Sequence, residues 1–294
     1  MKYQGSYCAL ITPFDSGGLD KKSFRNIIKW QIKNGIKGII PCGTTGESPT
    51  LSHEEHKEVV ELAVEVANKE VQVMAGSGSN STLEAISLTK HAKKSGADSA
   101  LIVVPYYNKP TQQGLYEHYI KIADSVDLPL FIYNIPGRSI VDMDNDTIAK
   151  LSEHDNIIGI KDASNNLSRP RIIKNMITHK HFYQLSGEDE TQLHFLAEGG
   201  DGVISVTANV APKLISQLHN FWQENKFEEA LNINKKLSNL NRILFVESNP
   251  SPVKFAAFKM GMCKEEIRLP LTTVSDKYQR LIIEQIEELG LTFS

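Results

Sequence analysis

The chain has 294 residues, of which 40% are hydrophobic and 23% are charged, proportions that are usual for a globular protein. Its 32 basic and 35 acidic side chains give a formal net charge of −3, which argues against nucleic acid or an anionic membrane as the main partner, since both need a basic surface. No run of about 18 apolar residues predicts a transmembrane helix, and no long apolar stretch after Met1 predicts a signal peptide.

Three cysteines, Cys8, Cys42 and Cys263, stand far apart in the chain. An odd number of widely separated cysteines fits neither a disulfide framework nor a cysteine-based zinc site. Cysteines of this number and spacing suit a reducing compartment, so we expect a cytoplasmic protein.

Short runs of apolar and β-branched residues recur along the first two thirds of the chain. There are eight: Tyr7–Phe14, Gly38–Cys42, Val71–Ala75, Ala100–Pro105, Pro129–Asn134, Ile157–Lys161, Phe182–Ser186 and Gly202–Val206. Most are continuous rather than alternating, as is typical of parallel strands buried on both faces. Segments with helical periodicity separate them, and two of these begin with capping boxes at Ser52 and Ser81. Strand and helix repeated eight times predict an α/β fold, the (β/α)8 TIM barrel.

Beyond about residue 225 the strand pattern stops and amphipathic helices follow, at Phe227–Leu244 and Val274–Leu289. We therefore expect a catalytic barrel over residues 1–224 and a C-terminal helical extension over residues 225–294. An open doubly wound sheet is the alternative fold. It normally carries a glycine-rich phosphate-binding turn, and Gly76-Ser77-Gly78 lacks the third glycine of that motif.

Active sites of such barrels lie at the carboxyl ends of the strands, so residues that end a strand are the first candidates. Among 25 lysines, Lys161 alone directly ends a strand-like apolar run. An amine desolvated inside a barrel loses its proton more readily than one in water, and a neutral amine attacks ketones to form a Schiff base. The alternative is a lysine paired with a carboxylate at the mouth of the barrel.

Further candidates follow neighbouring strands. Tyr133 ends the strand before that of Lys161, where its phenol either relays protons or simply packs. Arg138 lies in a Pro-Gly loop and suits a bidentate carboxylate contact, although a surface ion pair is equally common. Thr44 and Thr45 stand in a glycine-flanked turn that offers hydroxyls and backbone N–H groups to a small anion, or has only a structural role.

Metal catalysis is not favoured. His53 and His56 are three positions apart in His53-Glu54-Glu55-His56, which is not the zinc motif H-E-x-x-H. We expect two solvated histidines on a surface helix and no metal ion.

Three motifs together resemble those of the dihydrodipicolinate synthases, aldolases that form a Schiff base with pyruvate. They are Gly43-Thr44-Thr45-Gly46-Glu47, Tyr133-Asn134-Ile135-Pro136-Gly137-Arg138 and Gly159-Ile160-Lys161-Asp162-Ala163-Ser164. The resemblance continues through Pro105–Pro110, Gly202–Asn209 and Asn249-Pro250, so it spans the chain essentially end to end.

The resemblance implies that pyruvate forms an imine on Lys161 and that the derived enamine attacks L-aspartate 4-semialdehyde, in the pathway to diaminopimelate and lysine. It implies no cofactor and no metal. Catalytic residues would be Lys161, Tyr133, Thr44 and Tyr107, and residues that bind substrate would be Thr45, Arg138, Gly187 and Ile204. Tyr107 would reach across a subunit interface in a homotetramer, a dimer of dimers.

Feedback inhibition by L-lysine is also implied by the resemblance. The matching residues at a dimer interface are Ser48, His53, His56, Asn80, Glu84 and Tyr106. A capping role for Glu84 and simple exposure of the two histidines are the alternatives. The chain departs from the usual pattern at Pro49, where alanine is common, and at Glu188, where aspartate is common.

Two other functions compete with this interpretation. Sister aldolases that act on sugar acids, such as N-acetylneuraminate lyase, share the turn, the tyrosine and the lysine. Arg138 favours a short semialdehyde, because its carboxylate needs a cationic partner whereas a sugar needs hydroxyl partners. A non-catalytic sensor of small carboxylates would not need a nucleophilic lysine.

Overall fold

The computed structural model describes residues 3–293, and eight of its strands form a closed parallel barrel in the order β1-β10-β9-β8-β7-β6-β5-β4. The strands are β1 (Gly5–Ala9), β4 (Gly38–Ile40), β5 (Gln72–Gly76), β6 (Ser99–Val103), β7 (Leu130–Asn134), β8 (Ile157–Asp162), β9 (Tyr183–Ser186) and β10 (Gly202–Ser205). Each overlaps one predicted run. The (β/α)8 prediction is confirmed.

The first predicted strand is wrong in its extent. The run Tyr7–Phe14 belongs to the barrel only as far as Ala9, and its last residue begins β2 (Phe14–Asp15), which pairs antiparallel with β3 (Gly18–Leu19). The turn between β2 and β3 holds Gly17 at φ 83°, a conformation that glycine adopts without steric cost. This hairpin interrupts what reads in the sequence as one apolar run.

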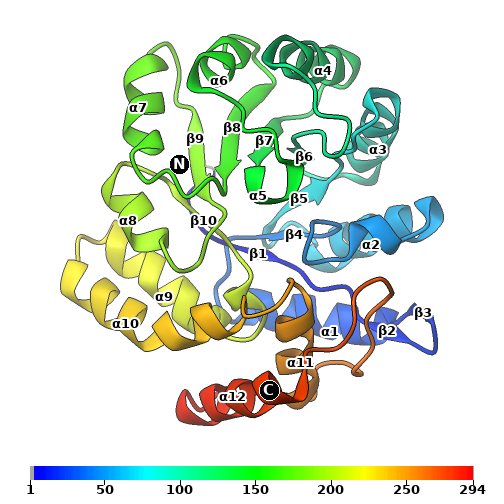
Figure 1. The fold of residues 1–294 in the computed structure, drawn as a ribbon, viewed down its shortest axis with the longest axis vertical. Helices are drawn as coiled ribbons and strands as arrows, with labels where there is room; N and C mark the ends of the chain where they lie inside the picture. The colour runs from blue at the N-terminus through cyan, green and yellow to red at the C-terminus, as the bar shows by residue number, and fades with distance from the viewer. Residues whose placement is uncertain (1–2, 294) are drawn as a thin grey trace. The chain divides into compact units, whose positions relative to one another are not determined.

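The chain divides into two compact units. The first, which we call the central unit, contains Met74–Ile204 and the described residues before Gly5. Its helices are α3 (Thr82–Ser95), α4 (Gln112–Ser125), α5 (Pro136–Ser139), α6 (Asn145–Leu151), α7 (Arg169–Met176) and α8 (Gln192–Ala197). Figure 1 shows α3, α4, α6 and α7 in succession, each packed on the next.

The second unit, which we call the terminal unit, contains Gly5–Val73 and the described residues from Ser205 onward. Its helices are α1 (Lys21–Lys33), α2 (His53–Ala67), α9 (Pro212–Gln223), α10 (Phe227–Ile243), α11 (Ser251–Lys259) and α12 (Asp276–Glu288), with short 3-10 helices η1 (Ser48–Thr50) and η2 (Thr207–Asn209). α10 and α12 confirm the two predicted C-terminal helices. A domain boundary at residue 225 stays a prediction.

Local signals in the sequence set the ends of the helices. At α2 the Ser52 hydroxyl accepts from the Glu55 amide, and the Glu55 carboxylate accepts from the Ser52 amide at 2.9 Å, which confirms the capping box. The second predicted capping box differs from the first: at α3 the Ser81 hydroxyl accepts from the Glu84 amide, but the Glu84 carboxylate accepts from the Ser79 hydroxyl. Gly96 then ends α3 in the left-handed conformation.

The barrel strands are shielded on both faces, as their continuous apolar sequences predict. Along β7, for example, Leu130, Phe131 and Ile132 are fully buried although consecutive side chains point to opposite faces. A polar side chain at the end of such a strand is therefore held in a largely dry environment. No helix within residues 3–293 combines the length and the apolar character that crossing a bilayer requires.

Candidate active site

Lys161 is the fifth residue of β8, and only 6% of its surface is exposed. β8 pairs with β7 so that Lys161 lies opposite Tyr133, and the Lys161 Nζ atom is 4.1 Å from the centre of the Tyr133 ring. This separation is that of a cation–π contact. Within the described residues Lys161 makes no ion pair with a carboxylate, so the contact with the Tyr133 ring is not part of a salt bridge. The structure brings together the predicted nucleophile and the predicted phenol.

Gly187 follows β9 and leaves space for the lysine side chain. A Cβ atom at this position would lie 3.1 Å from Cε of Lys161 and 2.7 Å from Cβ of Ala163. The Gly187 amide donates to the carbonyl of Asp162 at 2.7 Å. Any polar contact of Gly187 with substrate would therefore come from its carbonyl oxygen.

Glu188, the next residue, places a carboxyl group in the electrostatic field of Lys161. Burial raises the pKa of Glu188 to about 7, and the positive charge of Lys161 opposes this rise. The Ser186 hydroxyl lies 3.0 Å from the Glu188 carbonyl and 3.1 Å from its amide, which fixes the turn after β9. Such a carboxyl can exchange protons near neutral pH.

Arg138 lies on α5, a single helical turn that leaves the strand carrying Tyr133. Its side chain is exposed. The neighbouring Ser139 hydroxyl is 2.9 Å from the carbonyl of Ile135 and 3.0 Å from that of Val141, so the turn is closed on itself. The predicted carboxylate clamp therefore sits on a short, well-defined loop after β7.

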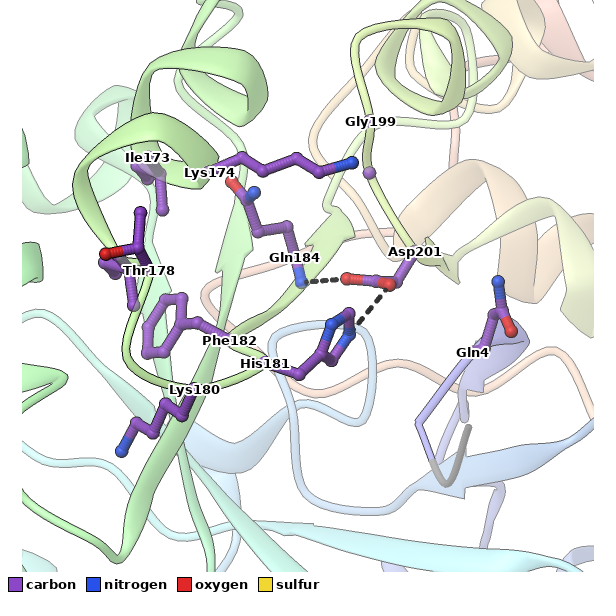
Figure 2. Close-up of a pocket in the computed structure, with 12 residues that line it drawn as sticks. Gln4, Ile173, Lys174, Thr178, Lys180, His181, Phe182, Gln184, Gly199 and Asp201 are labelled. Atoms are coloured by element: carbon purple, nitrogen blue, oxygen red, sulfur yellow. Dashed lines mark hydrogen bonds and ion pairs between the residues drawn. The ribbon is translucent and has the colours of Figure 1, made fainter.

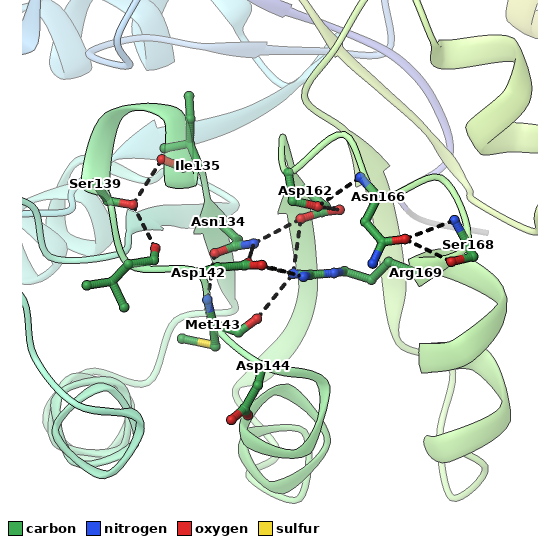
Figure 3. Close-up of polar contacts among 12 residues, drawn as sticks. Asn134, Ile135, Ser139, Asp142, Met143, Asp144, Asp162, Asn166, Ser168 and Arg169 are labelled. Atoms are coloured by element: carbon green, nitrogen blue, oxygen red, sulfur yellow. Dashed lines mark hydrogen bonds and ion pairs between the residues drawn. The ribbon is translucent and has the colours of Figure 1, made fainter.

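A polar cluster connects this loop to the ends of β7 and β8 (Figure 3). The Asn134 side-chain amide donates to Asp142 at 2.7 Å and to Asp162 at 3.0 Å, and its oxygen accepts from the Met143 amide at 3.0 Å. Both terminal nitrogens of Arg169 bind Asp142, at 3.0 and 2.9 Å, and Nη1 lies 3.5 Å from Asp162. Burial raises the pKa of Asp162, whereas the Arg169 charge opposes that rise.

In the terminal unit, the turn Gly43–Glu47 follows β4 and carries Thr44 and Thr45. Cys42 and Glu47, at its two ends, have φ of 56° and 54°, in the left-handed region that few non-glycine residues adopt. Thr45 is buried, and its hydroxyl oxygen accepts a hydrogen bond from the Asn249 amide at 2.9 Å. The Thr45 hydroxyl proton can still be donated to an anion.

Glu47 is anchored by the C-terminal part of the chain. Its side chain is fully buried, and its Oε1 atom lies 2.5 Å from Nζ of Lys254 on α11. Its Oε2 atom accepts from the Arg268 amide at 3.0 Å. A buried charge is stable only when it is paired and hydrogen-bonded, so Lys254 and Arg268 hold the threonine turn in its strained conformation.

Tyr106 and Tyr107 follow β6 in the central unit. The Tyr107 side chain is 89% exposed, and its backbone is in the left-handed region at φ 72°. The side-chain amide of Asn80 donates to the Tyr106 carbonyl at 3.1 Å, and that of Asn108 donates to the Asn80 carbonyl at 2.9 Å. These bonds hold the strained segment that presents the Tyr107 ring.

The residues predicted to bind lysine fall into two groups. In the central unit Asn80 contacts Tyr106, and burial together with the Glu84 charge raises the pKa of Tyr106. In the terminal unit, Ser48 begins η1 and His53 begins α2. His56 is only 7% exposed, so the expectation that it is a solvated surface residue is wrong.

Comparison with known proteins identifies the family of the chain. Residues 2–289 match the dihydrodipicolinate synthetase family. The chain belongs to this family. It is 50% identical over 290 residues to the 4-hydroxy-tetrahydrodipicolinate synthase of Gluconacetobacter diazotrophicus, with 98% of each protein covered.

Solved structures of the family have the same fold. Dihydrodipicolinate synthase from Aquifex aeolicus superposes with a TM-score of 0.96 at 46% identity, over 98% of this chain and 99% of the other. The chloride-inhibited enzyme from Acinetobacter baumannii, complexed with pyruvate, gives 0.95 at 47% identity over the same fractions. The enzyme from Cyanidioschyzon merolae with lysine bound gives 0.95 at 36% identity, again over 98% and 99%.

For this family member, the sequence did not reveal Asn134, Asp142, Arg169 or Lys254 as residues that support the site. Asn134 directly follows Tyr133 and Asp162 directly follows Lys161, each inside one of the motifs. Their place beside two predicted catalytic residues could have indicated a supporting role. Arg169 and Lys254 occupy ordinary helical sequence and carry no such signal. Within residues 3–293 no three His, Cys, Asp or Glu side chains group as a metal site requires.

A cavity of about 660 Å3 lies elsewhere in the central unit, at the amino ends of β9 and β10 (Figure 2). It contains a hydrogen bond between His181 and Asp201 at 3.1 Å, and Asp201 also accepts from the Gln184 amide at 2.8 Å. Its lining includes none of the predicted site residues of this family member. The Asp201 contacts tie the start of β10 to β9, which is a structural role.

Proposed function

We propose that this member of the dihydrodipicolinate synthetase family condenses pyruvate with L-aspartate 4-semialdehyde to form 4-hydroxy-tetrahydrodipicolinate. The observation that carries the proposal is the buried Lys161 amine, 4.1 Å from the Tyr133 ring at the carboxyl ends of two neighbouring strands. The relative from Gluconacetobacter diazotrophicus bears the name of this synthase, and the one from Acinetobacter baumannii is complexed with pyruvate.

The first half of the reaction forms the imine. The neutral Lys161 amine attacks the ketone carbon of pyruvate, and loss of one water from the carbinolamine leaves a Schiff base. Tyr133 supplies and removes the protons of these steps, with Thr44 and Tyr107 completing the relay. Thr45 donates its hydroxyl proton to the pyruvate carboxylate, since the hydroxyl oxygen already accepts from Asn249.

The second half forms the carbon–carbon bond. Loss of a methyl proton converts the imine to an enamine, whose terminal carbon attacks the aldehyde of the semialdehyde. Arg138 binds the semialdehyde carboxylate with its planar pair of donors, and Gly187 and Ile204 line the pocket. The amino group of the semialdehyde then attacks the imine carbon and displaces Lys161, which closes the ring. These steps consume no cofactor and no metal.

Assembly and regulation form part of the same proposal. The 89% exposure of Tyr107 suits a residue that enters the site of a second subunit, as in a homotetramer built from two dimers. L-lysine would bind through Asn80, Glu84 and Tyr106 of one group and Ser48, His53 and His56 of the other. The relative from Cyanidioschyzon merolae has lysine bound.

The setting is the pathway to diaminopimelate and lysine, in the cytoplasm. Among the described residues, Cys8, Cys42 and Cys263 form no disulfide, which suits a reducing compartment.

Borohydride trapping tests the proposed function. The protein is incubated with pyruvate, reduced, digested and sequenced by mass spectrometry, and we expect one reduced pyruvate adduct on Lys161. Lys161→Ala should fold normally and trap nothing, whereas Lys264→Ala, at an exposed lysine, should trap as the wild type does. An adduct on another lysine, or none on the wild type, contradicts the assignment.

A panel of aldehydes then identifies the second substrate. With pyruvate present, we expect product from L-aspartate 4-semialdehyde and little from sugar aldehydes. A preference for sugar aldehydes would instead identify a sugar-acid aldolase. Loss of activity on titration with millimolar L-lysine tests the regulatory part, and an unchanged rate would remove it.

A further inference from the structure

The cluster of Asn134, Asp142, Asp162 and Arg169 lies behind the proposed active site rather than in it. Consecutive side chains of a strand point to opposite faces. Tyr133 and Lys161 contact each other, so Asn134 and Asp162, which follow them and lie opposite one another in the register, point away from that contact. Figure 3 shows both side chains directed at Arg169 of α7.

Arg169 connects three of the segments that carry proposed active-site groups, those of Lys161, Tyr133 and Arg138. Its contact with Asp162 reaches the residue after Lys161, and Asp162 in turn binds Asn134, the residue after Tyr133. Its two bonds to Asp142 reach the segment that follows the Arg138 turn. Nη1 also donates to the Met143 carbonyl at 3.1 Å, on the same segment.

The geometry of these bonds depends on the planar shape of the guanidinium. A guanidinium holds its donors in a fixed fork, so two bonds to one carboxylate fix both distance and orientation. A lysine keeps the charge but offers a point donor that cannot make this fork. The side chains of Arg169 and Asp162 are 6% and 4% exposed, so water cannot easily replace a lost bond.

We propose that Arg169 is a positioning residue, which aligns the Lys161 amine with Tyr133 through Asp162 and Asn134, and places Arg138 through Asp142. The proposal rests on the proposed function for the identity of the substrates. The alignment of the Lys161 amine can be measured without any substrate.

The test combines amine reactivity with kinetics. The protein and its Arg169→Lys variant are exposed to cyanate, a small reagent for neutral amines, and carbamylation of Lys161 is measured by mass spectrometry relative to exposed Lys264. We expect the relative reactivity of Lys161 to change by about threefold or more in the variant. We also expect kcat/KM for the semialdehyde to fall by about 10- to 100-fold, as misplacement of reacting groups by about 1 Å does.

Asp142→Asn separates the effect of Arg169 on Arg138 from its effect on Lys161. Asp142 is 47% exposed, so this variant should fold, and it weakens the fork without touching the Asp162 contact. We expect a higher KM for the semialdehyde, through Arg138, with a smaller change in Lys161 reactivity. Arg25→Lys is the matched control, since Arg25 forks Glu65 at 2.8 Å on the surface, and both readouts should remain as in the wild type.

The outcomes are distinct. Wild-type Lys161 reactivity and wild-type KM values in Arg169→Lys overturn the proposal. A loss of kcat that only tracks the loss of folded protein, with KM and relative reactivity unchanged, also overturns it because it shows a purely structural role. If the wild type forms no product from the semialdehyde but Lys161 reactivity still responds to Arg169→Lys, the proposed function fails and the positioning role is supported.

Discussion

Replacing Gly187 by alanine tests whether the space beside Lys161 controls its reactivity. The added Cβ would lie 2.7 Å from Cβ of Ala163 and 3.1 Å from Cε of Lys161. Ordinary carbon–carbon contacts are about 3.5 Å or longer, so these two approaches are about 0.8 and 0.4 Å too short. Because φ of Gly187 is not in the left-handed region, the methyl group itself is the perturbation.

Ala163 directly follows β8 and its Cβ cannot rotate aside, so the 2.7 Å approach shifts the backbone locally. The flexible Lys161 chain yields to the 3.1 Å approach, so we expect the methyl group to displace the amine from the Tyr133 ring. A shift of this order should slow imine formation by about 10- to 100-fold. Overpacking should also lower the free energy of unfolding by about 1–3 kcal/mol. The fold should survive, so the loss of rate exceeds the loss of folded protein.

The assay is the rate of borohydride trapping with pyruvate, paired with urea unfolding of the same sample. Gly18→Ala is the control, because its added Cβ would meet only the Asp15 carbonyl oxygen, at an ordinary 3.8 Å. Trapping by Gly187→Ala at the wild-type rate, with wild-type stability, would refute the steric argument.

Three further predictions concern other contacts. Lys254→Met should cost about 3–5 kcal/mol in urea unfolding because it leaves the Glu47 carboxylate buried and unpaired. Lys264→Met, at an exposed pair, should lower the free energy of unfolding far less, and equal losses in the two variants would contradict this account. Tyr133→Phe should keep its ring on Lys161 yet slow trapping by about 10²-fold or more, and an unchanged rate would remove the proton relay. Glu188 and His118 should give stability–pH slopes of opposite sign. Burial raises the folded-state pKa of Glu188 from 4.5 to about 7, so its contribution to the free energy of unfolding, up to about 3 kcal/mol, is lost as pH rises from 4.5 to 7. Burial lowers the pKa of His118 from 6.5 to about 4, so its contribution to the free energy of unfolding is lost as pH falls from 6.5 to 4. Unfolding curves of Glu188→Gln and His118→Gln between pH 4 and 8 should each lack one slope, and identical pH profiles for both variants and the wild type would contradict the assignment.

The barrel could be predicted from sequence because each of its strands is an apolar run with its own local signal. The same signal placed Lys161 and Tyr133 at the ends of neighbouring strands, and the structure brings them into contact. The β2–β3 hairpin escaped prediction because Phe14 continues the apolar composition of the run before it. Composition alone does not show that backbone pairing stops at Ala9.

The supporting residues could not be predicted because their partners are distant in sequence. Lys254 pairs with Glu47 across 207 positions, and nothing near either residue marks the other. Arg169 looks like a surface residue at the start of a helix, yet its side chain is 6% exposed. Burial of such groups is decided by the packing of whole elements, which periodicity does not report.

The dependence of the threonine turn on Lys254 and Arg268 has a consequence for biosynthesis. The ribosome synthesises Glu47 more than two hundred residues before Lys254, the lysine that neutralises it. At a synthesis rate of about 5–20 residues per second, the Glu47 carboxylate remains without its lysine partner for on the order of 10–40 s. Without these contacts nothing stabilises the left-handed backbone at the ends of the turn. A nascent chain that lacks α11 therefore cannot yet position Thr44 and Thr45 correctly. Catalytic competence should therefore arise only after both Lys254 and Arg268 have been translated and have paired with Glu47.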